Sequence, residues 1–265
     1  MVEQRASSEM SNNNPIGVFD SGMGGLSVWK VLREHLPHES LLYFGDGARC
    51  PYGARTREEV LRFTVEAVEK MLAQGCKMIV LACNTATAVA VKHLRATYPD
   101  VAFVGLEPAV KPAVLSTESG IVAVLATRRS LEGDLFRQTS QQYADRAKIL
   151  AVVGEGFVEI VEQNEEHTPA TEQAVRRVVE PLIEAGADRI VLGCTHYPFL
   201  REVIERVVGE RRVEVIDSSE AVERRVEYLL DERGLRADED HLPQYEFASE
   251  AGEEYISKMR AKVGL

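Results

Sequence analysis

Short runs of apolar residues recur along the chain from residue 15 onward, and polar or helix-like segments separate them. The runs are rich in Val, Ile and Leu, and their lengths suit single buried strands. They cover residues 16–19, 41–44, 78–81, 102–104, 121–125, 149–153, 190–192 and 213–216. This alternation of strands and helices is typical of βαβ units and predicts an α/β protein with mostly parallel sheets.

The segments between these runs carry apolar residues at helical spacing. The clearest covers residues 60–72 and places apolar side chains at Val60, Leu61, Phe63, Val65, Val68, Met71 and Leu72. Thr56 stands just before its acidic first turn, which is the usual position of a helix N-cap.

Eight strands are more than one small doubly wound domain needs, so we predict two similar α/β lobes with helices flanking each sheet. We place the first lobe at residues 14–105 plus 217–265 and the second at 106–216, with 217–230 returning as a helix. Residues 1–13 are expected to be a disordered extension. The acidic tail, 231–265, contains a strand-like run at 244–248 and a helix-like run at 250–262, and the sequence assigns it no role.

Composition narrows the class of protein. The 265 residues are 45% hydrophobic and 28% charged, as in an ordinary globular protein, and the formal net charge is -11. This charge opposes a nucleic-acid backbone, and no apolar run approaches the roughly 20 residues of a membrane span. The polar N-terminal segment lacks the apolar region of a secretory signal. We therefore expect a cytoplasmic protein that acts on a small metabolite and has neither a nucleic acid nor a membrane as its partner.

Two of the four cysteines stand in nearly the same context. Cys83 lies in the segment LACNT at 81–85 and Cys194 in LGCTH at 192–196, and each segment ends an apolar strand. The repetition predicts a site with one sulfur from each lobe. Cys50 and Cys76 lack this context and are interpreted as structural, and the spacing of the four fits neither a zinc site nor a disulfide scaffold.

Other polar residues that follow strands support a site at the same edge of each sheet. Asp20 and Ser21 precede a glycine-rich segment whose GxGG spacing differs from nucleotide-binding loops and predicts a tight turn. Asn84 and Thr85 suit a carboxylate at a helix start. His196 is interpreted as a proton partner for Cys194, because a free thiol is mostly neutral at pH 7, and Asp20 can serve Cys83 in the same way.

Five motifs occur here in an order typical of one family. They are FDSGMGGL at 19–26, PYG at 51–53, ACNTA at 82–86, EPA at 107–109 and GCTHYP at 193–198. The chain from about 16 to 230 thereby resembles the cofactor-independent glutamate racemases of bacterial peptidoglycan synthesis, in the aspartate/glutamate racemase superfamily. The resemblance implies an active site in the cleft between two lobes, and no metal, pyridoxal phosphate or nucleotide cofactor.

The resemblance also implies roles for individual residues. Cys83 and Cys194 match the catalytic acid/base cysteines, and we expect Asp20 and His196 to be catalytic beside them as the proton partners described above. The matched substrate-contacting positions are Asp20, Ser21, Tyr52, Gly53, Asn84, Thr85, Thr127, Glu162, Thr195 and His196. Glu162 resembles an acidic group near the second cysteine. With L-glutamate bound, Cys194 would remove the α-proton and Cys83 would protonate the other face, giving D-glutamate for peptidoglycan synthesis.

Other classes of function remain open at this point. An aspartate racemase would use the same two thiols, although the GCTHYP motif favours glutamate. A thiol redox or metal-binding protein would join Cys83 and Cys194 through a disulfide or a metal ion. A non-catalytic binding protein and a homodimer are also left open.

Overall fold

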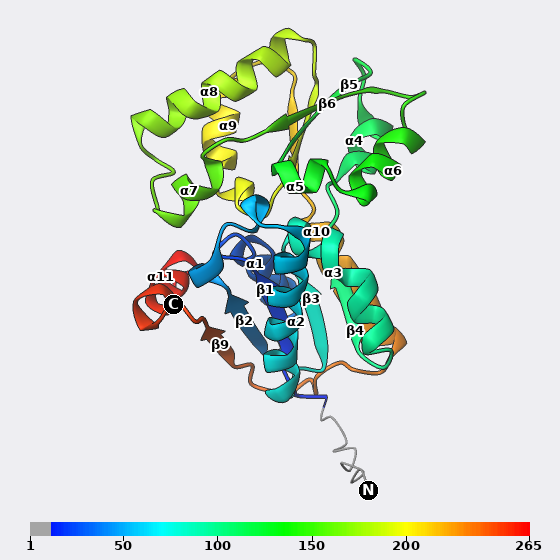
Figure 1. The fold of residues 1–265 in the computed structure, drawn as a ribbon, viewed down its shortest axis with the longest axis vertical. Coiled ribbons are helices and arrows are strands. Elements are labelled where there is room, and N and C mark those ends of the chain that lie inside the picture. The colour runs from blue at the N-terminus through cyan, green and yellow to red at the C-terminus, as the bar shows by residue number, and fades with distance from the viewer. Residues whose placement is uncertain (1–11) are drawn as a thin grey trace, which may run out of the picture.

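The computed structural model describes residues 12–265 and divides them into two lobes, one above the other in Figure 1. The sheet of the first lobe has the order β4-β3-β1-β2-β9, and all its pairings are parallel. Its strands are β1 (Ile16–Asp20), β2 (Leu41–Gly45), β3 (Met78–Leu81), β4 (Ala102–Gly105) and β9 (Tyr245–Ala248).

The sheet of the second lobe is also fully parallel and has the order β6-β5-β7-β8. Its strands are β5 (Ile121–Ala126), β6 (Lys148–Val153), β7 (Arg189–Gly193) and β8 (Glu214–Ile216). The predicted α/β fold with two parallel-sheet lobes is therefore confirmed, and all eight predicted apolar runs form strands.

Helices cover both faces of each sheet (Figure 1). Those of the first lobe are α1 (Leu26–His35), α2 (Arg57–Ala73), α3 (Asn84–Thr97), α10 (Ser219–Glu232) and α11 (Glu253–Lys262). Those of the second are α5 (Arg128–Leu131), α6 (Asp134–Gln142), α7 (Phe157–Glu162), α8 (Pro169–Glu184) and α9 (Arg201–Val208), with α4 (Val110–Ser116) where the chain enters the lobe. Short 3-10 turns occur at Gly47–Arg49, Tyr52–Ala54 and Tyr197–Leu200.

The side-chain alternation of β1 shows why the strands read as continuous apolar runs. Ile16 and Val18 pack on the face covered by α1 and α10, whereas Phe19 packs on the opposite face against α2 and α3. A parallel sheet buried on both faces needs apolar residues at successive positions. The β5 strand follows the same rule, with Leu125 facing α7, α8 and α9 and Val124 facing α4 and α6.

Helix α2 begins where the sequence predicts. The Thr56 hydroxyl accepts a hydrogen bond from the Glu59 amide, and the Glu59 carboxylate accepts one from the Thr56 amide. This reciprocal capping box satisfies amide groups that have no partner within the helix.

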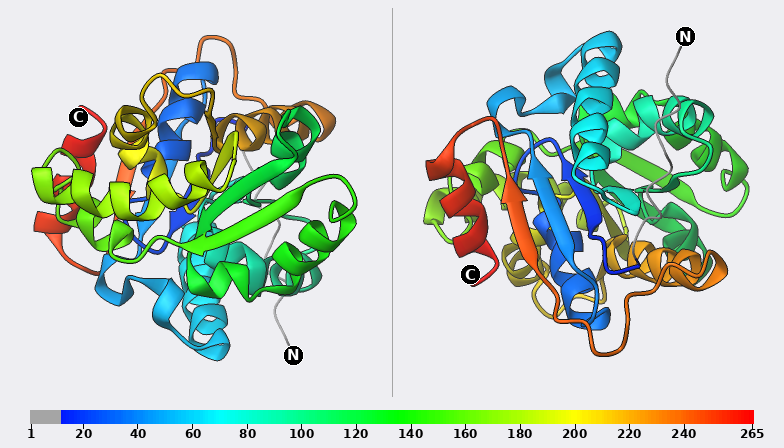
Figure 2. Two further views of the ribbon diagram at one scale, coloured as in Figure 1. Left: turned by 90° about the horizontal axis from the view of Figure 1, so that it is seen from above. Right: turned by 90° about the horizontal axis from the view of Figure 1, so that it is seen from below.

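The C-terminal tail completes the first lobe. Strand β9 pairs with β2 at the edge of the sheet, and α11 then packs beside it (Figure 2). Met259 of α11 and Phe247 of β9 are buried in the same core as Trp29 of α1. The tail therefore stabilises the first sheet and brings α11 next to the second lobe.

Of the predicted N-terminal extension, residues 1–11 lie outside the described residues. Asn13 exchanges two hydrogen bonds with Asp238, at 2.9 and 3.0 Å. Across residues 12–265, every helix is too short or too polar to cross a membrane.

Candidate active site

The carboxyl ends of four strands meet where the two lobes face each other. Ser21 follows β1, Cys83 follows β3, Thr127 follows β5 and Cys194 follows β7. They line one cavity of about 20 Å³ together with Pro51, Tyr52, Gly53, Asn84, Thr85, Val158, Thr195 and His196. Every predicted site residue except Asp20 and Glu162 lines this cavity, and these two bond to Thr195 and His196. The cavity has room for roughly one water molecule, so the lobes are closed over it.

Cys83 is the N-cap residue of α3 and is buried. Its sulfur accepts a hydrogen bond from the Ala86 amide at 3.5 Å, and its thiol donates one to the Ser21 hydroxyl at 3.6 Å. Burial, followed by the nearby negative charge of Asp20, raises the pKa of the Cys83 thiol to about 12. The resting thiol therefore keeps its proton at neutral pH and can act as an acid.

Asp20 joins the two lobes beside Cys83. Its Oδ1 accepts a hydrogen bond from the Gly22 amide at 2.8 Å, and its Oδ2 accepts one from the Thr195 hydroxyl at 3.0 Å. Burial raises the pKa of Asp20, although the charge of His196 and these two bonds oppose that shift.

Cys194 has a different polar neighbour. His196 Nδ1 lies 3.9 Å from the Cys194 sulfur, and both residues are buried. Burial disfavours the charged imidazole, but hydrogen bonds with Cys194, Cys50 and Glu162 raise the pKa of His196 well above its usual value. The second thiol therefore has an imidazole as its polar neighbour, whereas the first lies near the Asp20 carboxyl group.

Glu162 holds His196 from its other side. Its Oε1 lies 2.6 Å from His196 Nε2 and also accepts the Met23 amide hydrogen at 2.7 Å, while its Oε2 accepts the Tyr255 hydroxyl hydrogen at 2.5 Å. Burial opposes ionisation, but the bond to His196 and its charge hold the pKa of Glu162 below the usual value. Glu162 thus contacts the partner of Cys194.

Cys50 also lies at this site, which the structural interpretation of its thiol does not anticipate. The potential ligand atoms of Cys50, Glu162 and His196 lie within 4.8 Å of one another, the spacing of a metal-binding cluster. Burial raises the pKa of the Cys50 thiol to about 11, and the other two residues already bond to each other. A cation would have to break that bond and displace a tightly held proton, so the cluster fits a hydrogen-bond relay better than a metal centre.

A group of hydroxyls closes another side of the cavity. Thr85 Oγ1 at the start of α3 lies 3.1 Å from Thr127 Oγ1 across the lobe junction. Thr127 caps α5 and donates a hydrogen bond to Ser130 at 3.0 Å. Ser130 was missed from the sequence, although its position three residues after a capping threonine is a recognisable signal.

Tyr52 and Gly53 contribute differently to the cavity wall. The Tyr52 hydroxyl donates a 2.5 Å hydrogen bond to Asp46, so it is engaged outside the cavity. Gly53 packs against Thr127, whose Cβ would lie 3.1 Å from an added Cβ.

The turn after β1 needs its glycines because the second lobe packs directly on it. A Cβ on Gly22 would lie 2.3 Å from Glu162 Oε1, and one on Gly24 would lie 2.3 Å from His196 Nδ1. Both distances are far below van der Waals contact. The turn therefore presents Asp20 and Ser21 while its backbone touches the Glu162–His196 pair.

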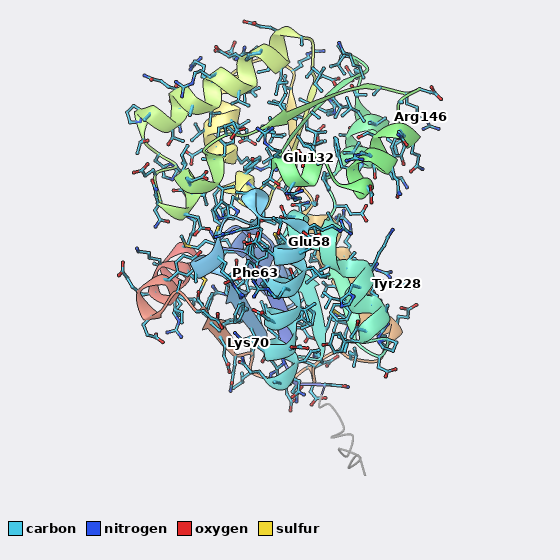
Figure 3. The ribbon with its side chains drawn as sticks, viewed as in Figure 1. Glu58, Phe63, Lys70, Glu132, Arg146 and Tyr228 are labelled. Carbon is cyan, nitrogen blue, oxygen red and sulfur yellow. The ribbon has the colours of Figure 1, made fainter. Side chains whose placement is uncertain are left out.

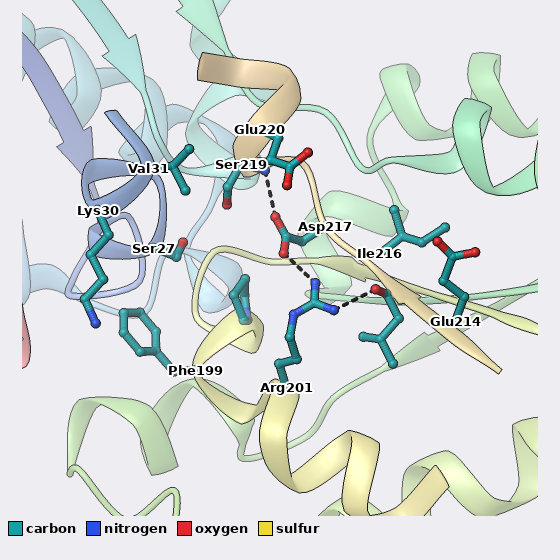
Figure 4. Close-up of a pocket in the computed structure, with 12 residues that line it drawn as sticks. Ser27, Lys30, Val31, Phe199, Arg201, Glu214, Ile216, Asp217, Ser219 and Glu220 are labelled. Atoms are coloured by element: carbon teal, nitrogen blue, oxygen red, sulfur yellow. Dashed lines mark hydrogen bonds and ion pairs between the residues drawn. The ribbon is translucent and has the colours of Figure 1, made fainter. Parts of the chain in front are cut away.

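A larger cavity, about 560 Å³, lies at the other side of the lobe junction (Figure 4). Arg201 is held there by Asp217 at 2.6 Å and by the Val215 carbonyl at 2.6 Å. The lining residues contain neither cysteine of the small cavity. Ser27 connects the two regions, because it lines the large cavity and its hydroxyl donates to the Thr195 carbonyl.

Comparison with known proteins agrees with this geometry. Residues 26–225 match the family described as Asp/Glu/Hydantoin racemase. A glutamate racemase from Herpetosiphon aurantiacus is 41% identical over 248 residues, which span 94% of this chain and 97% of the relative. The chain belongs to the glutamate racemases of this family. That family match had been predicted from the five sequence motifs and is confirmed.

The glutamate racemase fold extends over almost the whole chain. A glutamate racemase isoform from Bacillus anthracis superposes with a TM-score of 0.86 at 30% identity, covering 96% of this chain and 95% of that one. The glutamate racemase of Francisella tularensis, solved in complex with D-glutamate, gives a TM-score of 0.82 at 26% identity, covering 96% and 95%. Both alignments extend beyond the family match of residues 26–225.

Proposed function

We propose that this glutamate racemase interconverts L- and D-glutamate without a cofactor, with Cys83 and Cys194 transferring protons to and from opposite faces of the α-carbon. The observation that carries the proposal is that the two sulfurs, one from each lobe, line the same small cavity. Inversion at an α-carbon needs one group to remove a proton from one face and another to deliver a proton to the opposite face.

The surroundings of the two thiols suit them to different steps of the reaction. Cys83 is held as a neutral thiol and is ready to donate a proton. His196 Nδ1 lies 3.9 Å from the Cys194 sulfur and is placed to exchange a proton with it, so Cys194 is suited to accept the α-proton of L-glutamate. The reverse reaction exchanges these roles, and D-glutamate is formed for peptidoglycan synthesis.

The substrate carboxylate has donors available at the start of α3. Asn84 is buried, and its side chain makes no hydrogen bond within residues 12–265, so its amide is free to bind a ligand. Ser21, Thr85 and Thr195 line the same cavity. Donors fixed around a carboxylate stabilise the charge that develops when the α-proton leaves, and they act most strongly where water is excluded.

Substrate entry needs the lobes to separate, because the closed cavity holds roughly one water molecule. Two segments of the chain cross between the lobes, and the Ser218 hydroxyl of one donates to the Glu107 carbonyl of the other. These segments are suited to act as the hinge. Both thiols belong to one chain, so the chemistry needs no second copy. We place it in the cytoplasm, where a reducing environment keeps thiols free.

Racemisation in deuterated water tests the proposal. Purified protein is incubated with L-glutamate, D-glutamate or L-aspartate, and circular dichroism is followed together with loss of the α-proton signal. We expect both glutamate enantiomers to converge on the racemate, with deuterium entering the newly formed enantiomer, and aspartate to react much more slowly. Absence of α-proton exchange with every substrate would refute the mechanism.

A further inference from the structure

The C-terminal helix α11 belongs to the first lobe but bonds to the second. Met259 anchors it in the first-lobe core. Lys262 Nζ donates to the Val161 carbonyl at 3.1 Å, to Asn164 Oδ1 at 2.7 Å and to Glu166 Oε1 at 2.5 Å. These acceptors lie at the end of α7 and just after it, next to Glu162. The tail therefore reaches the back of the active site, and Figure 1 shows α11 below α7.

Tyr255 of α11 completes the bonding of the Glu162 carboxylate. One oxygen of Glu162, Oε1, bonds to His196 and to the Met23 amide. The other, Oε2, accepts a hydrogen bond from the Tyr255 hydroxyl at 2.5 Å. Among residues 12–265, Tyr255 is the hydrogen-bond partner of Oε2. The Glu162 side chain is 17% exposed, so losing this bond would leave a largely buried carboxylate oxygen with one partner fewer.

The position of the Tyr255 ring is fixed independently of its hydroxyl. A Cβ on Gly47 would lie 2.4 Å from Cζ of the ring and 2.5 Å from Cε1. The ring therefore lies directly against the Gly47 backbone, in space that any other residue at 47 would fill. Two features of the fold, the glycine and the docked helix, converge on the same hydroxyl position.

We propose that Tyr255 is a positioning residue for the Cys194 half of the reaction: it fixes Glu162, which in turn orients His196 beside the Cys194 sulfur. The proposal rests on the two-thiol function above. A partner that orients a catalytic imidazole through its carboxylate is a familiar way to set proton-transfer geometry. Cys83 receives no such support from α11, because its neighbours are Asp20, Ser21 and Ala86.

The two halves of the reaction can be separated by isotope effects. The two enantiomers have equal free energy in water, so any variant must lower kcat/KM equally in both directions. However, the isotope effect with α-deuterated L-glutamate reports the transition state at Cys194, where its deuterium is removed, and that with α-deuterated D-glutamate reports the transition state at Cys83. When one of these barriers is raised, the isotope effect that reports it becomes larger and the other isotope effect becomes smaller.

The test compares Tyr255→Phe with Tyr228→Phe. Tyr228 also donates a hydrogen bond to a glutamate, Glu232, but it is 52% exposed on the outer side of the first lobe (Figure 3). For Tyr255→Phe we expect kcat/KM to fall about 10-fold, mainly through kcat, with a larger isotope effect for L-glutamate and a smaller one for D-glutamate. Gly47→Ala keeps the hydroxyl but displaces the ring. Like Tyr255→Phe, it should therefore give a larger isotope effect for L-glutamate and a smaller one for D-glutamate. Tyr228→Phe should change neither.

The pH profile provides a second readout. The titratable groups that interact with Glu162 are His196, Cys50, Asp20, Tyr43 and Tyr255, and Cys194 lies beside His196. A hydrogen bond donated to a carboxylate favours its charged form, so Tyr255→Phe should move the acid limb of kcat/KM to higher pH, by up to about one unit. Isotope effects and a pH profile equal to those of the wild type would overturn the proposal, as would isotope effects that change in the same sense for both enantiomers.

The positioning role can be measured without turnover. Nitrogen NMR of His196 should show an altered titration in Tyr255→Phe and an unchanged one in Tyr228→Phe. An inactive wild type with this altered titration would refute the proposed function but keep the positioning role. An active wild type with an unaltered His196 titration in Tyr255→Phe would refute the positioning role alone.

Discussion

The Thr195 hydroxyl donates a 3.0 Å hydrogen bond to Asp20 Oδ2, which joins the end of β7 to the end of β1 across the lobe junction. Both residues are buried. Thr195 directly follows Cys194 in the sequence, and Asp20 lies near Cys83. We expect Thr195→Val to lower kcat/KM by roughly 10- to 100-fold, because a hydrogen bond to a buried carboxylate contributes about 1.5–3 kcal/mol. Racemisation followed by circular dichroism measures this change.

Thr195→Ser is the matched control, since it keeps the hydroxyl and removes a methyl group. We expect it to retain activity within about threefold of the wild type. A Val variant as active as the Ser variant would show that the bond to Asp20 does not support the activity.

The roles of the two cysteines should be distinguishable by which enantiomer of glutamate each single variant still exchanges with solvent. Replacing either Cys83 or Cys194 by Ser should reduce racemisation by at least about 100-fold, because each thiol supplies an acid/base step. Cys83→Ser keeps Cys194, the thiol that removes the α-proton of L-glutamate. This variant should therefore still exchange the α-proton of L-glutamate more readily than that of D-glutamate. Cys194→Ser should show the opposite preference. Proton NMR in deuterated water measures both rates.

Cys76→Ala controls for the loss of a buried thiol outside the site. Cys76 lies in the first-lobe core, so this variant should lose some stability but keep racemase activity. If either active-site variant retained wild-type racemisation, the division of labour between the two sulfurs would be wrong.

The strands and the cysteine sites could be predicted because their signals are local. Strands buried on both faces appear as short apolar runs, and the residues that follow them meet at one edge of a parallel sheet. The tail shows the limit of this approach. Its strand and helix were visible as patterns at 244–248 and 250–262, and α11 begins three residues later than that run, after Gly252 with a φ of 91°.

The support around the site could not be predicted because it depends on contacts between distant segments. Tyr255 bonds to Glu162 across 93 positions of sequence, and no periodicity links them. Cys50 lies beside His196 only because the loop after β2 folds toward the second lobe. The Tyr52 hydroxyl bonds to Asp46 because its ring packs against Phe19 and Phe63.

Asp188 should make the second lobe sensitive to acid. It accepts hydrogen bonds from the Thr117 hydroxyl and from the amides of Glu118 and Ser119, the latter two at 2.7 and 3.0 Å. Burial opposes ionisation, but these bonds lower the pKa of Asp188 from 3.8 to about 2. A carboxyl whose pKa is lower in the folded state adds stability above its unfolded pKa and loses it as the pH falls toward the folded value.

Asp188→Asn should therefore be less stable than the wild type at pH 7, by about 1 kcal/mol after allowance for solvent screening. The difference should shrink as the pH falls below about 4. Urea unfolding between pH 7 and pH 3.5 measures it, with the exposed Asp145→Asn as control. A difference that stayed constant over this range would assign the effect to packing and not to charge.

Gly24 should be indispensable for the geometry of His196. Its added Cβ would lie 2.3 Å from Nδ1 of the imidazole and 2.7 Å from the His196 backbone nitrogen, so turning the side chain alone cannot relieve the overlap. The lobes of Gly24→Ala would have to remain further apart, which lengthens the path between the Cys194 sulfur and the α-carbon. We expect a loss of activity of about 100-fold and a lower unfolding temperature. Gly133→Ala is the control, because its nearest contact is 3.3 Å and its φ of -71° suits alanine. Near wild-type activity in Gly24→Ala would mean that catalysis does not depend on the close approach of this turn to His196.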